Sequence, residues 1–181
     1  NKRVQAKTNE PYLRKESRQV INYEYPNATG RNTIIAYKSG YNLLPSIVEI
    51  DANGSERRIA TFDISLNDYF SYKNDLIVYA AYKPDSRWTN ESYSPVRLLD
   101  VKTGKTVTVG SAKARYFAPD ISEDGNLIVT VELLGNGNNR LVILDRNTGS
   151  AVYSSNWSAG ERFQFPKFIN NHSVLFAVAN E

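Results

Sequence analysis

The chain has 181 residues, of which 22 are lysine or arginine and 19 are acidic, giving a formal net charge of +3. It contains no cysteine, which excludes disulfides, thiol catalysis and cysteine-based metal sites. It also contains no apolar run of about 18 or more residues, the length that a membrane-spanning helix requires.

Residues 1–17 show no clear hydrophobic period, and we expect them to be a linker or the remnant of a preceding repeat. The excess of basic residues lies mainly in and just after this segment. Such a strip could indicate nucleic-acid or anionic-lipid binding. Its charge density is below that of a basic tail, so we expect a solvated strip and no nucleic-acid partner.

The remainder of the chain divides into units of similar pattern, in which short apolar and β-branched runs are bounded by Gly, Asn and Asp. Such runs are typical of β-strands. The units lie near residues 18–63, 64–114, 115–160 and 161–181. The predicted strands lie near 19–25, 33–38, 46–51 and 56–62 in the first unit, 75–82 and 95–100 in the second, 126–132 and 140–144 in the third, and 163–168 and 173–179 in the fourth. The second unit also carries the longest insertion, at 83–94.

The units align with one another around a proline. When Pro119 is placed on Pro166 or on Pro26, aromatic residues before it and apolar residues after it coincide without a gap. The second unit lacks the proline but shares a Leu-Asp-x-x-Thr-Gly turn with the third, at Leu99–Gly104 and Leu144–Gly149. A period of roughly 40–50 residues is that of four-stranded propeller blades. An α-helical repeat is the alternative, but these runs are too short and too rich in β-branched residues for helices.

The segment Ala118–Ile128, followed by the turn at Leu144–Gly149, resembles the repeat of TolB-type (WD-like) β-propellers of exported bacterial proteins. The resemblance extends from about Tyr23 to Val178 and is fullest in the third unit. It implies an all-β fold, a partial β-propeller of about three complete four-stranded antiparallel blades and half of another. Because closed propellers typically have four to eight blades, we expect the chain to be part of a longer protein. The resemblance also implies a location in the periplasm or at the cell surface.

Few residues in the sequence suggest a catalytic, metal-binding or cofactor-binding role. The single histidine, His172, occupies a predicted turn, and we expect it to be an exposed turn residue. The sequence lacks the zinc-binding, nucleophile-elbow and phosphate-binding loop motifs of common enzymes. We therefore predict no catalytic residue, no metal site and no cofactor in this chain.

One segment imitates the start of a calcium loop, with Asp120, Ser122 and Asp124 at alternate positions before Gly125. A calcium loop requires a bidentate Glu at its twelfth position, and that position is Val131. We therefore expect the three polar side chains to cap the hairpin turn by bonding backbone N–H groups.

The remaining candidate site is a surface. In a propeller, the loops between the second and third strands share one face with the loops between blades. Aromatic and arginine residues on such loops are typical anchors of recognition sites. The candidate ligand-binding residues are Tyr41, Arg87, Trp88, Tyr93, Trp157 and Arg162. The alternative for each tryptophan is that it folds back to cover the edge of a blade.

These patterns predict a non-catalytic binding or scaffold module that recognises a protein, peptide or glycan through loops on one face. The alternative is the substrate-gating propeller of a prolyl-peptidase-like serine hydrolase whose catalytic domain lies outside this chain. A third reading is a purely structural scaffold inside a larger envelope protein. Propellers serve many functions, so the repeat by itself does not choose among them.

Overall fold

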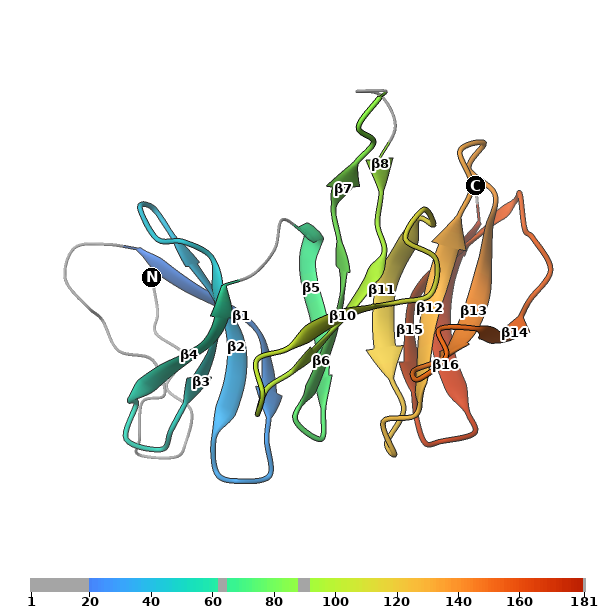
Figure 1. Cartoon of the computed structure of the whole chain (residues 1–181). Coiled ribbons are helices and arrows are strands. Elements are labelled where there is room, and N and C mark those ends of the chain that lie inside the picture. The colour runs from blue at the N-terminus through green and yellow to red at the C-terminus, as the bar shows by residue number, and fades with distance from the viewer. Residues whose placement is uncertain (1–19, 62–64, 88–91, 181) are drawn as a thin grey trace. The chain divides into compact units, whose positions relative to one another are not determined.

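The computed structural model describes residues 20–61, 65–87 and 92–180, and all regular structure within these ranges is β-strand (Figure 1). The chain separates into two compact units, Asn1–Phe62 and Asp63–Glu181. The predicted all-β class is confirmed. No helix of the described residues is long and apolar enough to cross a membrane.

The first unit contains one four-stranded antiparallel sheet, the first sheet, in the order β1-β2-β3-β4. Its strands are β1 (Ile21–Ala28), β2 (Ile34–Gly40), β3 (Ser46–Ile50) and β4 (Glu56–Thr61). The central strands supply its buried side chains, including Ile35, Tyr37 and Ile47. The four strands predicted for this segment are therefore present, each within a few residues of its expected position.

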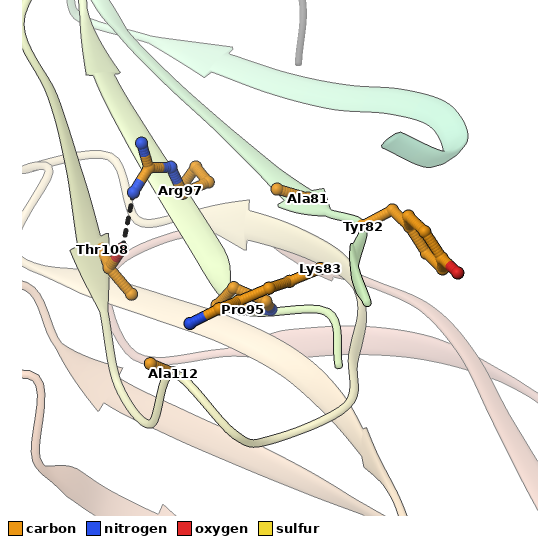
Figure 2. A pocket seen from close by; sticks show the side chains of 7 residues that line it. All are labelled: Ala81, Tyr82, Lys83, Pro95, Arg97, Thr108 and Ala112. Carbon is orange, nitrogen blue, oxygen red and sulfur yellow. Dashed lines mark hydrogen bonds between the residues drawn. The ribbon is translucent and has the colours of Figure 1, made fainter. Parts of the chain in front are cut away.

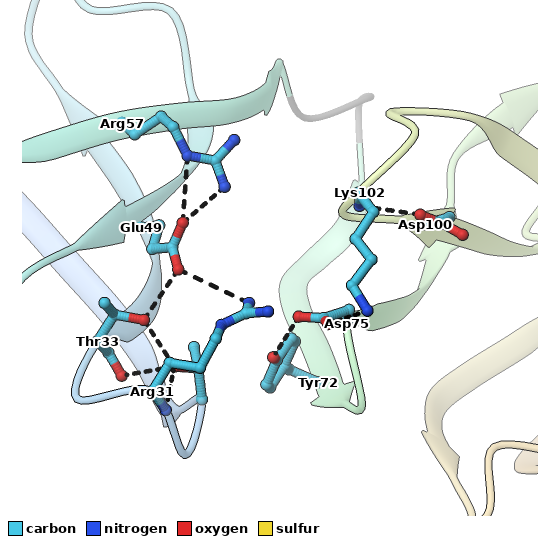
Figure 3. Close-up of polar contacts among 9 residues, drawn as sticks. Arg31, Thr33, Glu49, Arg57, Tyr72, Asp75, Asp100 and Lys102 are labelled. Carbon is cyan, nitrogen blue, oxygen red and sulfur yellow. Dashed lines mark hydrogen bonds and ion pairs between the residues drawn. The ribbon is translucent and has the colours of Figure 1, made fainter.

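An ionic cluster covers part of the first sheet. Thr33, Arg31 and Arg57 converge on the Glu49 carboxylate (Figure 3). Arg57 Nη2 lies 2.6 Å from Glu49 Oε2, and Thr33 Oγ1 donates to Oε1 at 2.9 Å. The bond from Arg57, against the opposing effect of burial, lowers the pKa of Glu49 below its ordinary value.

The second unit contains the second, third and fourth sheets. The second sheet, in the order β10-β9-β6-β5, consists of β5 (Ser65–Lys73), β6 (Leu76–Ala81), β9 (Val96–Asp100) and β10 (Thr106–Val109). The third consists of β11 (Tyr116–Ile121), β12 (Leu127–Leu133), β13 (Asn139–Asp145) and β14 (Ala151–Ser154), in chain order. The fourth pairs β15 (Glu161–Phe168) with β16 (Val174–Asn180). The insertion of the second unit forms a short hairpin of β7 (Lys83–Pro84) and β8 (Ser92–Tyr93).

The main core of the second unit lies between the second and third sheets. Val78, Val96 and Leu98 from the second sheet belong to one cluster with Ile128 and Leu144 from the third. Fully burying each such side chain contributes roughly 1.5–3 kcal/mol. The facing sides of the second and third sheets are therefore dry because each sheet covers the other, as the repeat pattern requires.

The aligned prolines occupy equivalent β-bulges. In the first, third and fourth sheets the register of the opening strand shifts across the proline. The residues before the prolines have left-handed φ angles, namely 52° at Tyr25, 46° at Ala118 and 46° at Phe165. Proline donates no N–H to a ladder and is tolerated at edge strands and bulges. β1, β11 and β15 are edge strands, so the proline that recurs in the sequence marks the bulge of each opening strand.

The two shared Leu-Asp-x-x-Thr-Gly turns have the same geometry. Asp100 Oδ1 accepts the backbone N–H of Lys102 at 2.9 Å and that of Thr103 at 2.8 Å. Asp145 Oδ1 accepts the N–H groups of the corresponding residues at 3.0 and 2.8 Å. The bonds from Thr103 and Thr148, the largest causes, lower the pKa of each carboxyl. The aspartate thus closes each turn through its own side chain.

Candidate recognition surface

The described anchors of the second unit, Arg87, Tyr93, Trp157 and Arg162, lie at one end of its sheets, which we call the loop end. It carries the β7–β8 hairpin, the β12–β13 loop and the segment that joins β14 to β15. The three parts are tied together, because Arg115 at the start of the third sheet donates from Nε to Ser92 O at 2.7 Å. Arg162 in the fourth sheet donates from Nη1 to Gly137 O at 3.0 Å.

Asp85 organises the β7–β8 hairpin. Its Oδ1 accepts the backbone N–H of Arg87 at 2.7 Å, and its Oδ2 accepts the hydroxyl of Tyr93 at 3.1 Å. Tyr93 is half-buried and held to the hairpin, whereas Arg87 is exposed. The Lys83–Ser94 insertion is therefore a hairpin that presents Arg87 to solvent, with Tyr93 serving partly as its support.

Trp157 lies against Arg140 of β13. The Arg140 guanidinium carbon is 4.3 Å from the centroid of the Trp157 ring, a cation–π contact. The guanidinium also bonds to Glu132 on the paired strand β12. Arg140 Nε and Nη2 lie 2.8 and 2.7 Å from Glu132 Oε2. Trp157 remains 37% exposed. The ring thus contacts an arginine and remains partly exposed to solvent.

Arg115 and Arg162 occupy equivalent positions in successive units, and each bonds its own sheet to the preceding one. Each begins near the first strand of its sheet and donates to a backbone carbonyl in the loop region of the preceding sheet. The β12–β13 loop lies between them, because Cβ atoms added at Gly135 and Gly137 would lie within 4 Å of Arg115 and Arg162, respectively. Arg162, predicted as a ligand anchor, therefore has an evident structural task.

Sequence reasoning missed Asn139, the buried polar residue that joins the third sheet to the fourth. Its Nδ2 donates to Glu161 O at 2.7 Å and its Oδ1 accepts the N–H of Phe163 at 3.0 Å. Ser94 joins the second sheet to the third in a similar way, because its Oγ donates to Tyr116 O at 2.8 Å. A single Asn in an Asn-rich loop gives no sequence signal for this role.

Two of the predicted anchors are not part of this grouping. Tyr41 is 83% exposed in the turn between β2 and β3, in the first unit. Trp88 lies outside the described residues. The structure therefore places Arg87, Tyr93, Trp157 and Arg162 in the segments of the loop end, and their role as ligand contacts stays a prediction.

The calcium-like segment forms a turn cap, with one correction. Ser122 Oγ accepts the N–H of Leu127 at 2.9 Å, and Asp124 Oδ1 accepts the N–H of Asn126 at 3.1 Å, as expected of caps. The expectation was wrong for Asp120, which is almost completely buried and bonds to the fourth sheet. No cluster of potential metal ligands occurs among the described residues.

Asp120 of β11 makes polar contacts with β5 and β15, the first strands of the second and fourth sheets. Its Oδ2 accepts the N–H of Phe168 in β15 at 2.8 Å, and Ser71 of β5 donates to Oδ1. Lys167 Nζ lies 3.1 Å from Oδ1 and 4.8 Å from the centroid of the Tyr69 ring. Burial opposes the charge of Lys167, but the Asp120 carboxylate and Tyr69 outweigh it and raise the pKa of the lysine. The contact joins strands of the second, third and fourth sheets.

His172 is exposed in the turn between β15 and β16, where its backbone N–H donates to Asn170 Oδ1 at 2.7 Å. Neither an acid nor a nucleophile is paired with its ring within the described part of the chain. The described residues thus contain no arrangement of the serine–histidine type.

Solved structures with the same architecture are β-propellers, whereas no family model and no curated protein matches the sequence. The chain is similar to TolB from Acinetobacter baumannii, at 14% identity and a TM-score of 0.58 over 86% of this chain and 40% of that one. It is similar to a putative TolB from Agrobacterium tumefaciens, at 14% identity and a TM-score of 0.62 over 82% and 51%. It is also similar to the β-propeller domain of the Trilobed protease from Pyrococcus furiosus, at 13% identity and a TM-score of 0.52 over 87% and 53%. The chain spans about half the length of these structures or less, and its fold is a partial β-propeller of the TolB type.

Proposed function

We propose that this TolB-type β-propeller chain is a non-catalytic recognition or scaffold module that binds a protein, peptide or glycan through its loop end. The observation that carries the proposal is the partly exposed ring of Trp157, which contacts the Arg140 guanidinium that Glu132 holds in place. Trp, Tyr and Arg are the residue types that dominate binding energy at interfaces.

The arrangement suits binding because its parts are ordered before any ligand arrives. Arg140 lies in a strand, and its guanidinium is fixed by two bonds to one carboxylate oxygen. A ring that is already immobilised loses little conformational entropy on contact with a ligand. Arg87 and Tyr93 on the neighbouring hairpin extend the same end with a positive charge and a second aromatic ring.

A binding screen with a matched variant tests this proposal. The chain would be screened against peptide and glycan libraries, and any binder measured again with Trp157→Ala and with Tyr153→Ala. Tyr153 is an exposed aromatic residue of β14 without a place at the loop end. Loss of a central anchor costs about 2 kcal/mol or more, which is roughly thirtyfold in Kd.

The expected result is that Trp157→Ala weakens binding and Tyr153→Ala does not. Equal effects of the two variants, or a complete lack of binders among proteins, peptides and glycans, would contradict a recognition role of the loop end. The purely structural scaffold would then be favoured.

We further propose that the protein is exported to the periplasm or the cell surface, which cell fractionation with an antibody to the chain would test.

The second candidate function is substrate gating for a serine peptidase. The likeness to the propeller of the Trilobed protease favours this candidate, since that propeller is a domain of a protease. Reaction of the complete protein with a serine-directed fluorophosphonate probe separates the two candidates. Covalent labelling outside this chain supports gating, whereas an unlabelled protein supports the recognition module.

A further inference from the structure

A second potential site lies on the second sheet, in a cavity of about 410 Å³ (Figure 2). None of the residues that line it belongs to the Trp157–Arg140 grouping. The described lining residues are Ala81, Tyr82, Lys83, Pro95, Arg97, Thr108 and Ala112. Ligand pockets have volumes of roughly 300–1,000 Å³, so the cavity has room for a small ligand.

The pairing of β9 with β10 places the polar groups of the cavity. Arg97 stands directly opposite Thr108 in the ladder, and its Nη1 donates to Thr108 Oγ1 at 2.7 Å. Its neighbours in the strand, Val96 and Leu98, are buried in the core shared with the third sheet. Because side chains alternate along a strand, Arg97 and Thr108 lie on the opposite face of the second sheet.

The charged residues among the described lining of the cavity are both cationic. Lys83 and Arg97 line it, and none of its described lining residues is acidic. Lys83 forms no ion pair within the described ranges. Asp85, the acid that follows Lys83 closely in the chain, accepts bonds from the Arg87 N–H and the Tyr93 hydroxyl in the hairpin.

Three of the other described lining residues are apolar. Ala81, Pro95 and Ala112 line the cavity together with the two cationic residues. An arginine fork matches the two oxygens of a carboxylate, and an ammonium adds a compact positive charge beside it. A hydroxyl such as that of Thr108 both donates and accepts hydrogen bonds.

We propose that this cavity binds a small ligand through a carboxylate group, with Lys83 and Arg97 contacting the carboxylate and Pro95 contacting the carbon skeleton. Two sources of this chemistry fit the size, an acidic sugar and an acidic amino-acid side chain. Thr108 positions the guanidinium and can bond to a ligand hydroxyl. The site is distinct from the loop end, and its occupation does not depend on the function proposed for Trp157.

Titration of the full chain with matched pairs of compounds tests the proposal. The probes are glucuronate against glucose, and N-acetylglutamate against N-acetylglutamine, followed by calorimetry and by the backbone amide signals of β9 and β10. The expected result is saturable binding of at least one carboxylate, about tenfold or more tighter than its uncharged partner. Binding within only one pair identifies the source of the carboxylate. Equal binding of charged and uncharged partners, or no saturable binding of any probe, overturns the proposal.

Substitution of the cationic lining residues tests whether the carboxylate binds in this cavity. Lys83→Gln and Arg97→Gln are each expected to weaken carboxylate binding about tenfold. Lys105→Gln, which removes an exposed charge from the β9–β10 turn of the same sheet, is expected to leave it unchanged. Lys83 is itself exposed, so its replacement tests the site without dependence on the folding of the Arg97 variant. Equal weakening by Lys83→Gln and Lys105→Gln would show attraction to the general surface charge and would overturn the site.

Discussion

The buried carboxylate of Asp120 accepts the backbone N–H of Phe168 at 2.8 Å, and this bond ties the opening strand of the third sheet to that of the fourth. Asp120→Ala leaves a buried N–H without its acceptor, and we expect a loss of about 2–3 kcal/mol in the free energy of unfolding. Asp120→Asn keeps one acceptor oxygen and should cost less. Urea denaturation measures both, with Glu123→Ala as control, because the Lys73–Glu123 pair is largely exposed. An Asp120→Ala variant as stable as the control would refute this role.

Gly110 marks a close approach between the second and third sheets. A Cβ at this position would lie 2.9 Å from Leu144 Cδ1 and 3.1 Å from the Tyr116 hydroxyl, at a φ of +80°. Gly110→Ala therefore combines a left-handed backbone with a steric clash, and we expect a loss of about 2–4 kcal/mol. Gly104→Ala is the matched control, because its φ is +69° and nothing lies within 4 Å. Thermal melting should show the larger loss at Gly110, and equal losses would exclude the clash.

Asn139 holds the fourth sheet to the third through its side-chain amide. We expect Asn139→Ala to cost about 1–3 kcal/mol, because Glu161 O and the Phe163 N–H both lose a buried partner. The effect should be local, and hydrogen exchange of β15 amides should accelerate more than that of β6 amides. Asn156→Ala, an exposed change in the following loop, should alter neither. Equal acceleration of hydrogen exchange in β15 and β6 would contradict a local role of Asn139.

Stability is expected to fall in acid. The folded-state pKa values of Glu49 and Asp100 are lowered, by hydrogen bonds from Arg57 and from the Thr103 N–H. Each ionised carboxyl therefore stabilises the fold fully above its ordinary pKa of 4.5 or 3.8, and this contribution disappears as the pH falls through the lower folded value. Urea midpoints measured from neutral pH to below 3.8 should decline, and less steeply in Asp100→Asn. An identical decline in that variant would show that Asp100 does not contribute.

Local features of this protein could be predicted from sequence because their causes are local. Strands followed from short β-branched runs, and the turns of Asp100 and Asp145 followed from an aspartate that bonds N–H groups two and three residues later. The recurring proline marks equivalent positions in three of the units. The bulge that it marks became evident only from the register of the paired strands.

The sequence by itself determined the repeat, the strands and the chemistry of the turns. Only the tertiary structure decided which polar side chains join the sheets and which stay available for a ligand. Asp120 reads as a turn residue in sequence, yet its partner Phe168 is 48 residues away, and Asn139 finds Phe163 at a separation of 24. The stacking of Trp157 on Arg140 likewise depends on how a connecting segment returns over β13. Such contacts form only when sheets pack, because a hydrogen bond or a ring contact is set by distance in space, and no periodicity along the chain encodes it.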